Sequence, residues 1–236
     1  MEIRIFNKKL ILSNNRLILS NNRLQSLPAE IGNLINLQYL SLSNNQLQSL
    51  PAEIGNLHNL NYLDLYNNQL QSLPAEIGYL INLQELYSPY NKLQSLPAEI
   101  GNLINLRKLS LSNNQLQNLP AEIGNLVNLQ ELYLSNNKLQ SLPAEICNLR
   151  NLKSFELSNN QLQSLPAEIL KIKKILYIDD TSYDINNLNM NNYFLIFYKL
   201  TNKITNLPIN INEIWIKKNI NELNIKIPFN CKIKYF

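Results

Sequence analysis

Few residues of this chain are of the types that make or break bonds. The sequence of 236 residues contains one histidine, His58, and two distant cysteines, Cys147 and Cys231. A zinc-type site needs several His or Cys ligands at short spacings, and no such set occurs. All five glycines follow an isoleucine at regular intervals, so none belongs to a phosphate-binding loop. The sequence therefore predicts no catalytic residue, no metal site and no cofactor, and it favours a protein that is not an enzyme.

Tyrosines and acidic residues form a second group of chemically distinctive side chains. They recur two positions apart, as in Tyr62-x-Asp64-x-Tyr66, and residues two apart point to the same face of a strand. Tyrosine offers a large contact area with a polar tip, which suits a binding surface, although aromatic residues are also good strand formers. We expect a protein-binding surface at Tyr39, Tyr62, Asp64, Tyr66, Glu85, Tyr87, Tyr90, Lys108, Glu131, Tyr133 and Glu156.

A 23-residue repeat must position these side chains. Leu27 is followed by Pro, Ala, Glu and Ile, and these five residues return every 23 positions through Leu165. Within one unit Leu40 and Leu42 lie two apart, so both point inward from a strand while Tyr39 and its alternating neighbours face outward. One unit cannot bury its leucines alone, so successive units must stack. The repeat predicts an α/β solenoid.

The segment from Leu37 to Leu47 reads Leu-x-x-Leu-x-Leu-x-x-Asn-x-Leu and resembles the leucine-rich repeat. It is most similar to the 23-residue Leu-Pro-x-x-Ile-Gly-x-Leu class, which includes plant intracellular Ras-group-related proteins, Ras-suppressor proteins, and amoebal and giant-virus repeat proteins. The resemblance covers residues 27 to about 185. It implies a horseshoe with a parallel concave sheet and short helical or 3-10 segments on the convex side. It also implies a protein partner on the concave face and, by family analogy, a small GTPase or another signalling protein.

Two further repeat positions have structural interpretations. The second asparagine of each unit, as in Asn45, is expected to be buried, where its amide can satisfy backbone groups of adjacent coils. The glycine, as in Gly32, is expected to allow close approach between coils, and Cys147 replaces it in the last regular unit. His58 stands where other units carry mostly isoleucine, so we expect it on the convex surface. The predicted asparagine ladder comprises Asn22, Asn45, Asn68, Asn91, Asn114, Asn137 and Asn160.

The repeat changes at both ends of the chain. Residues 10–15 and 17–22 are near copies seven positions apart, too close for two coils, and the second has the correct spacing to Leu27. We expect Leu17 to begin the array and the earlier copy, with Ile3 and Ile5, to form a partial cap or to fray. The predicted parts are a cap at 1–26, regular repeats at 27–187, and degenerate repeats or a C-terminal cap at 188–236. A separate small C-terminal domain is the alternative.

Two internal departures are also visible. Ser88 replaces an inward leucine and Pro89 follows it, which predicts a local bulge because proline cannot donate to a sheet ladder. Repeat drift and a functional kink are both possible explanations. Counting onward by 23 residues places Asp180 where a leucine belongs.

Charge and composition narrow the function. The net charge of +4 is modest, and the outward strand positions carry more acids than bases, which disfavours nucleic acid. The longest apolar run, Tyr193–Tyr198, is too short to span a bilayer. With no secretory apolar region at the start and no disulfide framework, we expect a cytoplasmic protein. The leading hypothesis is a monomeric interaction scaffold. The alternative is a structural or self-associating array without a specific ligand.

Overall fold

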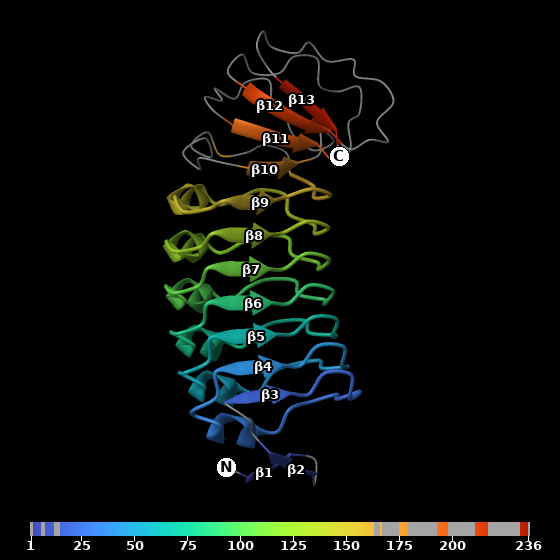
Figure 1. Ribbon diagram of the computed structural model, residues 1–236, viewed down its shortest axis with the longest axis vertical. Coiled ribbons are helices and arrows are strands. Elements are labelled where there is room, and N and C mark those ends of the chain that lie inside the picture. Colours follow the sequence, from blue (N-terminus) through green and yellow to red (C-terminus); the bar gives the residue numbers. More distant parts are fainter. Residues whose placement is uncertain are drawn as a thin grey trace.

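The computed structural model shows a stack of coils in which each regular coil contributes one strand and one 3-10 helix (Figure 1). The structure describes residues 15–162 and 166, together with the backbone of strands at 2–5, 8–11, 175–178, 193–197, 211–216 and 232–235. The strands follow one another along one side of the stack and the helices along another (Figure 1). This arrangement is the predicted horseshoe solenoid with a parallel concave sheet and 3-10 convex segments.

The regular elements have nearly identical lengths from coil to coil. The strands are β3 (Arg16–Ile18), β4 (Tyr39–Ser41), β5 (Tyr62–Asp64), β6 (Glu85–Tyr87), β7 (Lys108–Ser110), β8 (Glu131–Tyr133) and β9 (Ser154–Glu156). The 3-10 helices are η1 (Ala29–Asn33), η2 (Ala52–Asn56), η3 (Ala75–Tyr79), η4 (Ala98–Asn102), η5 (Ala121–Asn125) and η6 (Ala144–Asn148).

The strand register places the central leucine of every regular strand in one row. Leu17 is paired with Leu40, Leu40 with Leu63, and so on to Leu132 with Phe155, all in parallel. Leu40 and Leu42 have no exposed surface, whereas the outward Tyr39 is half-buried. The predicted inward and outward alternation is therefore confirmed. The inward leucines and the Ile of each 3-10 helix form one continuous core.

Buried asparagines tie successive coils together as predicted, but the expectation is wrong for Asn22, which is exposed and donates to the carbonyl of Ser20 in its own coil. In the central part of the array, Asn114 Oδ1 accepts the backbone N–H of Leu93 at 3.0 Å, and its Nδ2 donates to the carbonyls of Ser88 and Leu111 at 2.9 Å each. The same contacts recur one coil on at Asn137. Each side chain thus satisfies backbone groups in its own coil and the preceding one, which is a structural role.

A second row of asparagines, which the sequence analysis missed, lies at the exposed turn before each strand. Asn105 Nδ2 donates to the carbonyl oxygen of Ile81 in the preceding coil at 2.9 Å, and Asn128 does the same to Ile104 at 2.8 Å. The signal was present in the sequence, because the Asn-Leu pair before every strand has the same period as the buried asparagine. The asparagines with this contact among the described residues are Asn59, Asn82, Asn105, Asn128 and Asn151.

The repeat glycines mark the closest approach between coils. A Cβ added to Gly101 would lie 2.5 Å from the carbonyl oxygen of Glu122 in the next coil, so any side chain there forces the coils apart. Cys147 occupies this position in η6 and is buried. The strand after it, β9, keeps the 23-residue step, because Phe155 pairs with Leu132.

Four further strands extend the same sheet beyond β9. They are β10 (Ile175–Ile178), β11 (Tyr193–Phe197), β12 (Ile211–Ile216) and β13 (Lys232–Tyr235), parallel and in chain order. Leu176 pairs with Phe155, a step of 21 residues, and Leu195 pairs with Leu176, a step of 19. The 23-residue count that reached Asp180 does not follow the register beyond β9, and Asp180 itself lies outside the described residues. The division at residues 187 and 188 stays a prediction.

Leu10 and Ile11, the first residues of the N-terminal copy, lie in a separate hairpin. Strands β1 (Glu2–Ile5) and β2 (Lys8–Ile11) pair antiparallel in a sheet of their own. Leu17 lies in β3, the first strand of the main sheet, as expected. That the hairpin acts as a cap over the core stays a prediction.

Candidate protein-binding surface

Outward tyrosines of successive strands stack on one another. The ring centroids of Tyr39 and Tyr62 are 4.3 Å apart with nearly parallel planes, and those of Tyr62 and Tyr87 are 5.4 Å apart and tilted. Neighbouring strands lie about 4.8 Å apart, so Tyr39 and Tyr62, which are paired in register, come naturally to stacking distance. Tyr87 is paired with Asp64 and contacts Tyr62 diagonally. The rings shield one another, and each is only half-buried. The result is an aromatic strip across β4, β5 and β6.

Arg16 closes the N-terminal end of this strip. Its guanidinium carbon lies 3.7 Å from the centroid of the Tyr39 ring, a cation–π contact. Arg16 is not among the binding residues predicted from the sequence. Alternation around Leu17 was the available signal, because it places Arg16 and Ile18 outward on β3. Ile18 is 61% exposed.

Tyr66 and Tyr90 form a second and more exposed aromatic pair. Their centroids are 5.4 Å apart in an edge-to-face arrangement, and they are 39% and 52% exposed. Tyr66 follows β5 in the outward row, as expected. Tyr90 instead occupies the first-asparagine position of its coil, equivalent to Asn67, and its backbone has the same left-handed conformation, with φ of 55°. The expectation that Tyr90 is an outward strand residue is therefore wrong, although its side chain still contacts Tyr66.

The predicted bulge at Ser88 and Pro89 is absent. The register from β5 through β6 to β7 is unbroken, and Ser88 is fully buried in the leucine row. In this part of each coil the ladder uses N–H groups at alternate positions, so Ser88 and Tyr90 donate to the carbonyls of Ser110 and Ser112. Pro89 lies between them, where its missing N–H removes no ladder bond.

Each predicted acid on the first half of the surface has a hydroxyl partner. Asp64 accepts a hydrogen bond from Ser41 Oγ at 3.0 Å, and Glu85 accepts one from the Tyr87 hydroxyl at 2.7 Å. Burial, followed by the hydrogen bond to Glu85, raises the pKa of Tyr87 to about 12. Burial, followed by the charge of Asp64, also raises the pKa of Tyr62 well above its usual value. Both tyrosines are therefore neutral hydrogen-bonding groups at physiological pH.

Lys108 is the centre of the second half of the surface. Its ammonium forms a 2.8 Å ion pair with Glu131 and lies 5.4 Å from the ring centroids of both Tyr87 and Tyr133. The hydrogen bond with Glu131 raises the pKa of Lys108, and it lowers the pKa of Glu131. The Tyr133 hydroxyl also donates to Glu131 at 2.9 Å. Tyr87 and Tyr133 thus hold the ammonium group of Lys108 near their ring faces, and this ammonium is paired with the carboxylate of Glu131.

The predicted residues that flank this group lie where the register places them. Glu156 is half-buried on β9 and accepts a 3.3 Å hydrogen bond from Ser158 Oγ. Apart from Tyr90, all predicted binding residues are outward strand positions or their direct continuation. His58 is exposed on the turn after η2, with Nδ1 3.1 Å from the carbonyl oxygen of Tyr79. Among the described residues there is no group of three potential metal-ligating side chains and no helix long and apolar enough to cross a membrane.

Comparison with protein families identifies one model. A family described as a leucine-rich repeat region matches residues 17–132 and 91–192, together more than half of the chain. No curated protein matches the sequence.

Solved structures with the same arrangement include bacterial and plant proteins. A leucine-rich-repeat protein of Leptospira interrogans is 28% identical with a TM-score of 0.52, covering 93% of this chain and 78% of that one. The ectodomain of the Arabidopsis thaliana membrane receptor kinase GASSHO1/SCHENGEN3, in complex with CASPARIAN STRIP INTEGRITY FACTOR 2, is 29% identical with a TM-score of 0.63. The match covers 24% of the receptor chain and 86% of this chain.

The plant peptide hormone receptor RGFR1, in complex with RGF2, is 27% identical with a TM-score of 0.57, covering 92% of this chain and 44% of the receptor. This chain therefore spans less than half the length of either plant receptor.

Proposed function

The chain belongs to the leucine-rich-repeat family, and on this basis we propose that it is a non-enzymatic interaction module that binds a partner protein on its concave face. The proposed contact surface is the aromatic and acidic strip on β4, β5 and β6, continued by the charged residues of β7 to β9. The proposed setting is the cytoplasm, with the protein acting as a monomer and binding neither nucleic acid nor membrane.

The observation that carries this proposal is the outward tyrosine strip. Inward positions of the regular strands are filled almost entirely by leucine, so strand propensity alone does not explain tyrosine at the outward ones. Exposed Tyr66 and Tyr90, beside half-buried neighbours, give the mixture of apolar area and hydroxyl tips that is common at interaction surfaces. The two plant receptors were solved with bound ligands, which supports a protein or peptide ligand for this chain.

The chemistry of the strip favours a partner with basic side chains. Arg16 over Tyr39, and Lys108 over Tyr87 and Tyr133, are cations of this chain held on tyrosine faces. Tyr66 and Tyr90 have similar rings, and Asp64 lies on the strand that leads to Tyr66. A lysine or arginine of the partner would complete the same arrangement. A small GTPase or other signalling protein is suggested by the repeat class alone.

A triple substitution tests the surface. Tyr62, Tyr66 and Tyr87 changed together to Ala should abolish capture of partners from an extract of the source cell, because the variant removes both aromatic groups. Circular dichroism should be unchanged, since none of the three side chains belongs to the leucine core.

The matched control truncates three exposed apolar side chains away from the strip. Tyr79, Ile81 and Ile104 are 55%, 51% and 53% exposed, and their triple Ala variant should retain every partner. Retention of partners by the tyrosine variant as well would disprove the concave-face proposal.

A structural or self-associating array is the second candidate. The observation that favours it is Ile18, an apolar side chain 61% exposed on β3, the strand that ends the main sheet. Sheet edges with exposed apolar residues are prone to pair with another chain.

A further inference from the structure

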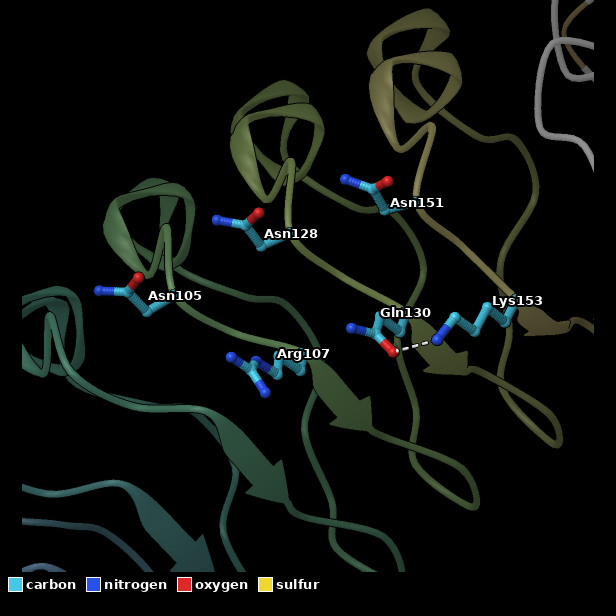
Figure 2. Close-up of a pocket in the computed structure, with 6 residues that line it drawn as sticks. All are labelled: Asn105, Arg107, Asn128, Gln130, Asn151 and Lys153. Atoms are coloured by element: carbon cyan, nitrogen blue, oxygen red, sulfur yellow. Dashed lines mark hydrogen bonds between the residues drawn. The ribbon is translucent and has the colours of Figure 1, made fainter.

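A polar groove lies beside the proposed concave surface, at the ends where β7, β8 and β9 begin (Figure 2). Its volume is about 480 Å³. Three of the lining side chains, Arg107, Gln130 and Lys153, immediately precede the three strands and lie along one side of the groove (Figure 2). The lining residues are Asn105, Arg107, Asn128, Gln130, Asn151 and Lys153.

The groove has positive charge and hydrogen-bond donors but no carboxylate in its lining. Arg107 and Lys153 are exposed, and among the described residues neither forms an ion pair. Lys153 Nζ donates to Gln130 Oε1 at 2.7 Å, which holds the lysine along the groove (Figure 2). The lining asparagines donate to backbone carbonyls of the preceding coil, so they shape the groove. Arg107 and Lys153 are the groups left to attract an anion.

Comparison between coils shows that this charge is a departure from the repeat. The equivalent positions in the first three coils are the neutral amides Gln38, Asn61 and Gln84. Among the coils at residues 15–162, two replace the amide by a cation, and these two coils flank the one with Gln130. Arg107 and Lys153 are separated by two strand spacings, about 10 Å. This distance is close to the length of three residues of an extended chain, at about 3.3 Å per residue. Acidic side chains on one extended segment can therefore reach both cations.

We propose that this groove binds an acidic polypeptide segment through carboxylates that reach Arg107 and Lys153. The ligand differs in charge from the basic partner proposed for the aromatic strip, and the site uses none of the strip's tyrosines. An acidic peptide fits better than a nucleic acid. Glu131 follows Gln130 directly, and Lys153 is close enough to help lower its pKa. This fixed negative charge disfavours a continuous phosphate backbone more than a peptide with separated carboxylates.

Binding of a fluorescein-labelled hexaglutamate peptide tests the proposal. The double variant Arg107→Gln with Lys153→Gln introduces the glutamine that three other coils carry at this position, as Gln38, Gln84 and Gln130, so the fold should be retained. We expect saturable binding by the wild-type protein at low salt and at least about tenfold weaker binding by the double variant. The difference in affinity between the wild-type protein and the double variant should become smaller as the salt concentration is raised.

The control variant removes the same net charge elsewhere. Lys92 and Lys138 are exposed, and the equivalent positions in other coils carry glutamine, so Lys92→Gln with Lys138→Gln is an equally conservative double change. It should bind hexaglutamate like the wild type. Equal loss in both double variants, or no wild-type binding, would overturn the groove proposal. Binding of a thymidine oligonucleotide with the same dependence on Arg107 and Lys153 would overturn the choice of a peptide.

The tyrosine triple variant separates the two sites. It should bind hexaglutamate normally even where it has lost its partner. Experiments that disprove the proposal for the aromatic strip and experiments that disprove the proposal for the groove therefore give different results.

Discussion

At the scale of single residues, Tyr90 combines backbone strain with a place on the surface. Its φ of 55° is shared with asparagines at the equivalent positions of other coils, such as Asn67 and Asn113. A left-handed backbone costs a residue with a Cβ about 1–2 kcal/mol, and asparagine tolerates it best apart from glycine. Strain of this kind is often found where a side chain serves a binding function.

Replacement of Tyr90 by Asn should therefore stabilise the fold while weakening the aromatic pair. The lost contact with Tyr66 is exposed and is worth about 0.5 kcal/mol, the low end for aromatic pairs. The relieved strain is larger, so we expect a net gain of about 0.5–1 kcal/mol in the free energy of unfolding by urea. As the reverse control, Asn113→Tyr should lose about 1 kcal/mol or more. A less stable Tyr90→Asn protein would show that the ring contact outweighs the strain.

At the same scale, the two-residue alternation predicts which side chains face outward only while the backbone remains a strand. Counting outward from Leu40 placed Tyr39, Tyr62 and Tyr87 correctly, because the two-residue period is set by the strand itself. Tyr90 was misplaced because it lies three residues after Tyr87, so alternation from Tyr87 reaches Pro89 and not Tyr90. At Tyr90 the backbone is left-handed.

At the scale of the coil, the two asparagine rows have the same period but different energetic weight. Asn114 is buried, and its amide bonds three backbone groups. Asn105 is exposed and donates one bond, so water can replace its partner. We expect Asn114→Ala to cost about 1–3 kcal/mol, because it leaves buried backbone groups unpaired. Asn105→Ala should cost under about 1 kcal/mol.

Equilibrium unfolding in urea, followed by circular dichroism, measures both values. The two substitutions remove the same atoms from neighbouring positions in the stack, so the difference between them measures the combined effect of burial and of the additional hydrogen bonds. Equal costs would mean that the buried row is not the principal polar support of the array.

Elements built by the repeat were predictable, and those beyond it were not. Strands, 3-10 helices, buried asparagines and the spacing role of Gly32 all follow from one 23-residue unit. The C-terminal register was not predictable, because the residues after Ile169 no longer follow the repeat that was being counted. The groove at Arg107 and Lys153 escaped notice for another reason. Its residues precede the strands and come from three coils, so no single unit reveals it.

At the scale of the whole molecule, the ends of the sheet decide between a free module and an associating array. The strand order runs from β3 to β13, so these two strands are the ends of an eleven-stranded sheet. The sequence of β13 has lysine at positions 232 and 234, and charged edge strands resist pairing with another chain. The opposite strand, β3, carries exposed Ile18 and also Arg16, whose charge has the protective effect of an edge lysine.

We expect the purified protein to be a monomer of 27.3 kDa by light scattering at micromolar concentration, because both end strands carry basic residues. If a larger mass is found, Ile18→Lys should restore the monomer, since it removes the exposed apolar side chain from β3 without touching the leucine core. A dimer that persists in Ile18→Lys would exclude β3 as the contact and move the search for association to the aromatic strip. In that case the tyrosine triple variant should be monomeric, and the strip would be occupied by a second copy of this chain in place of another protein.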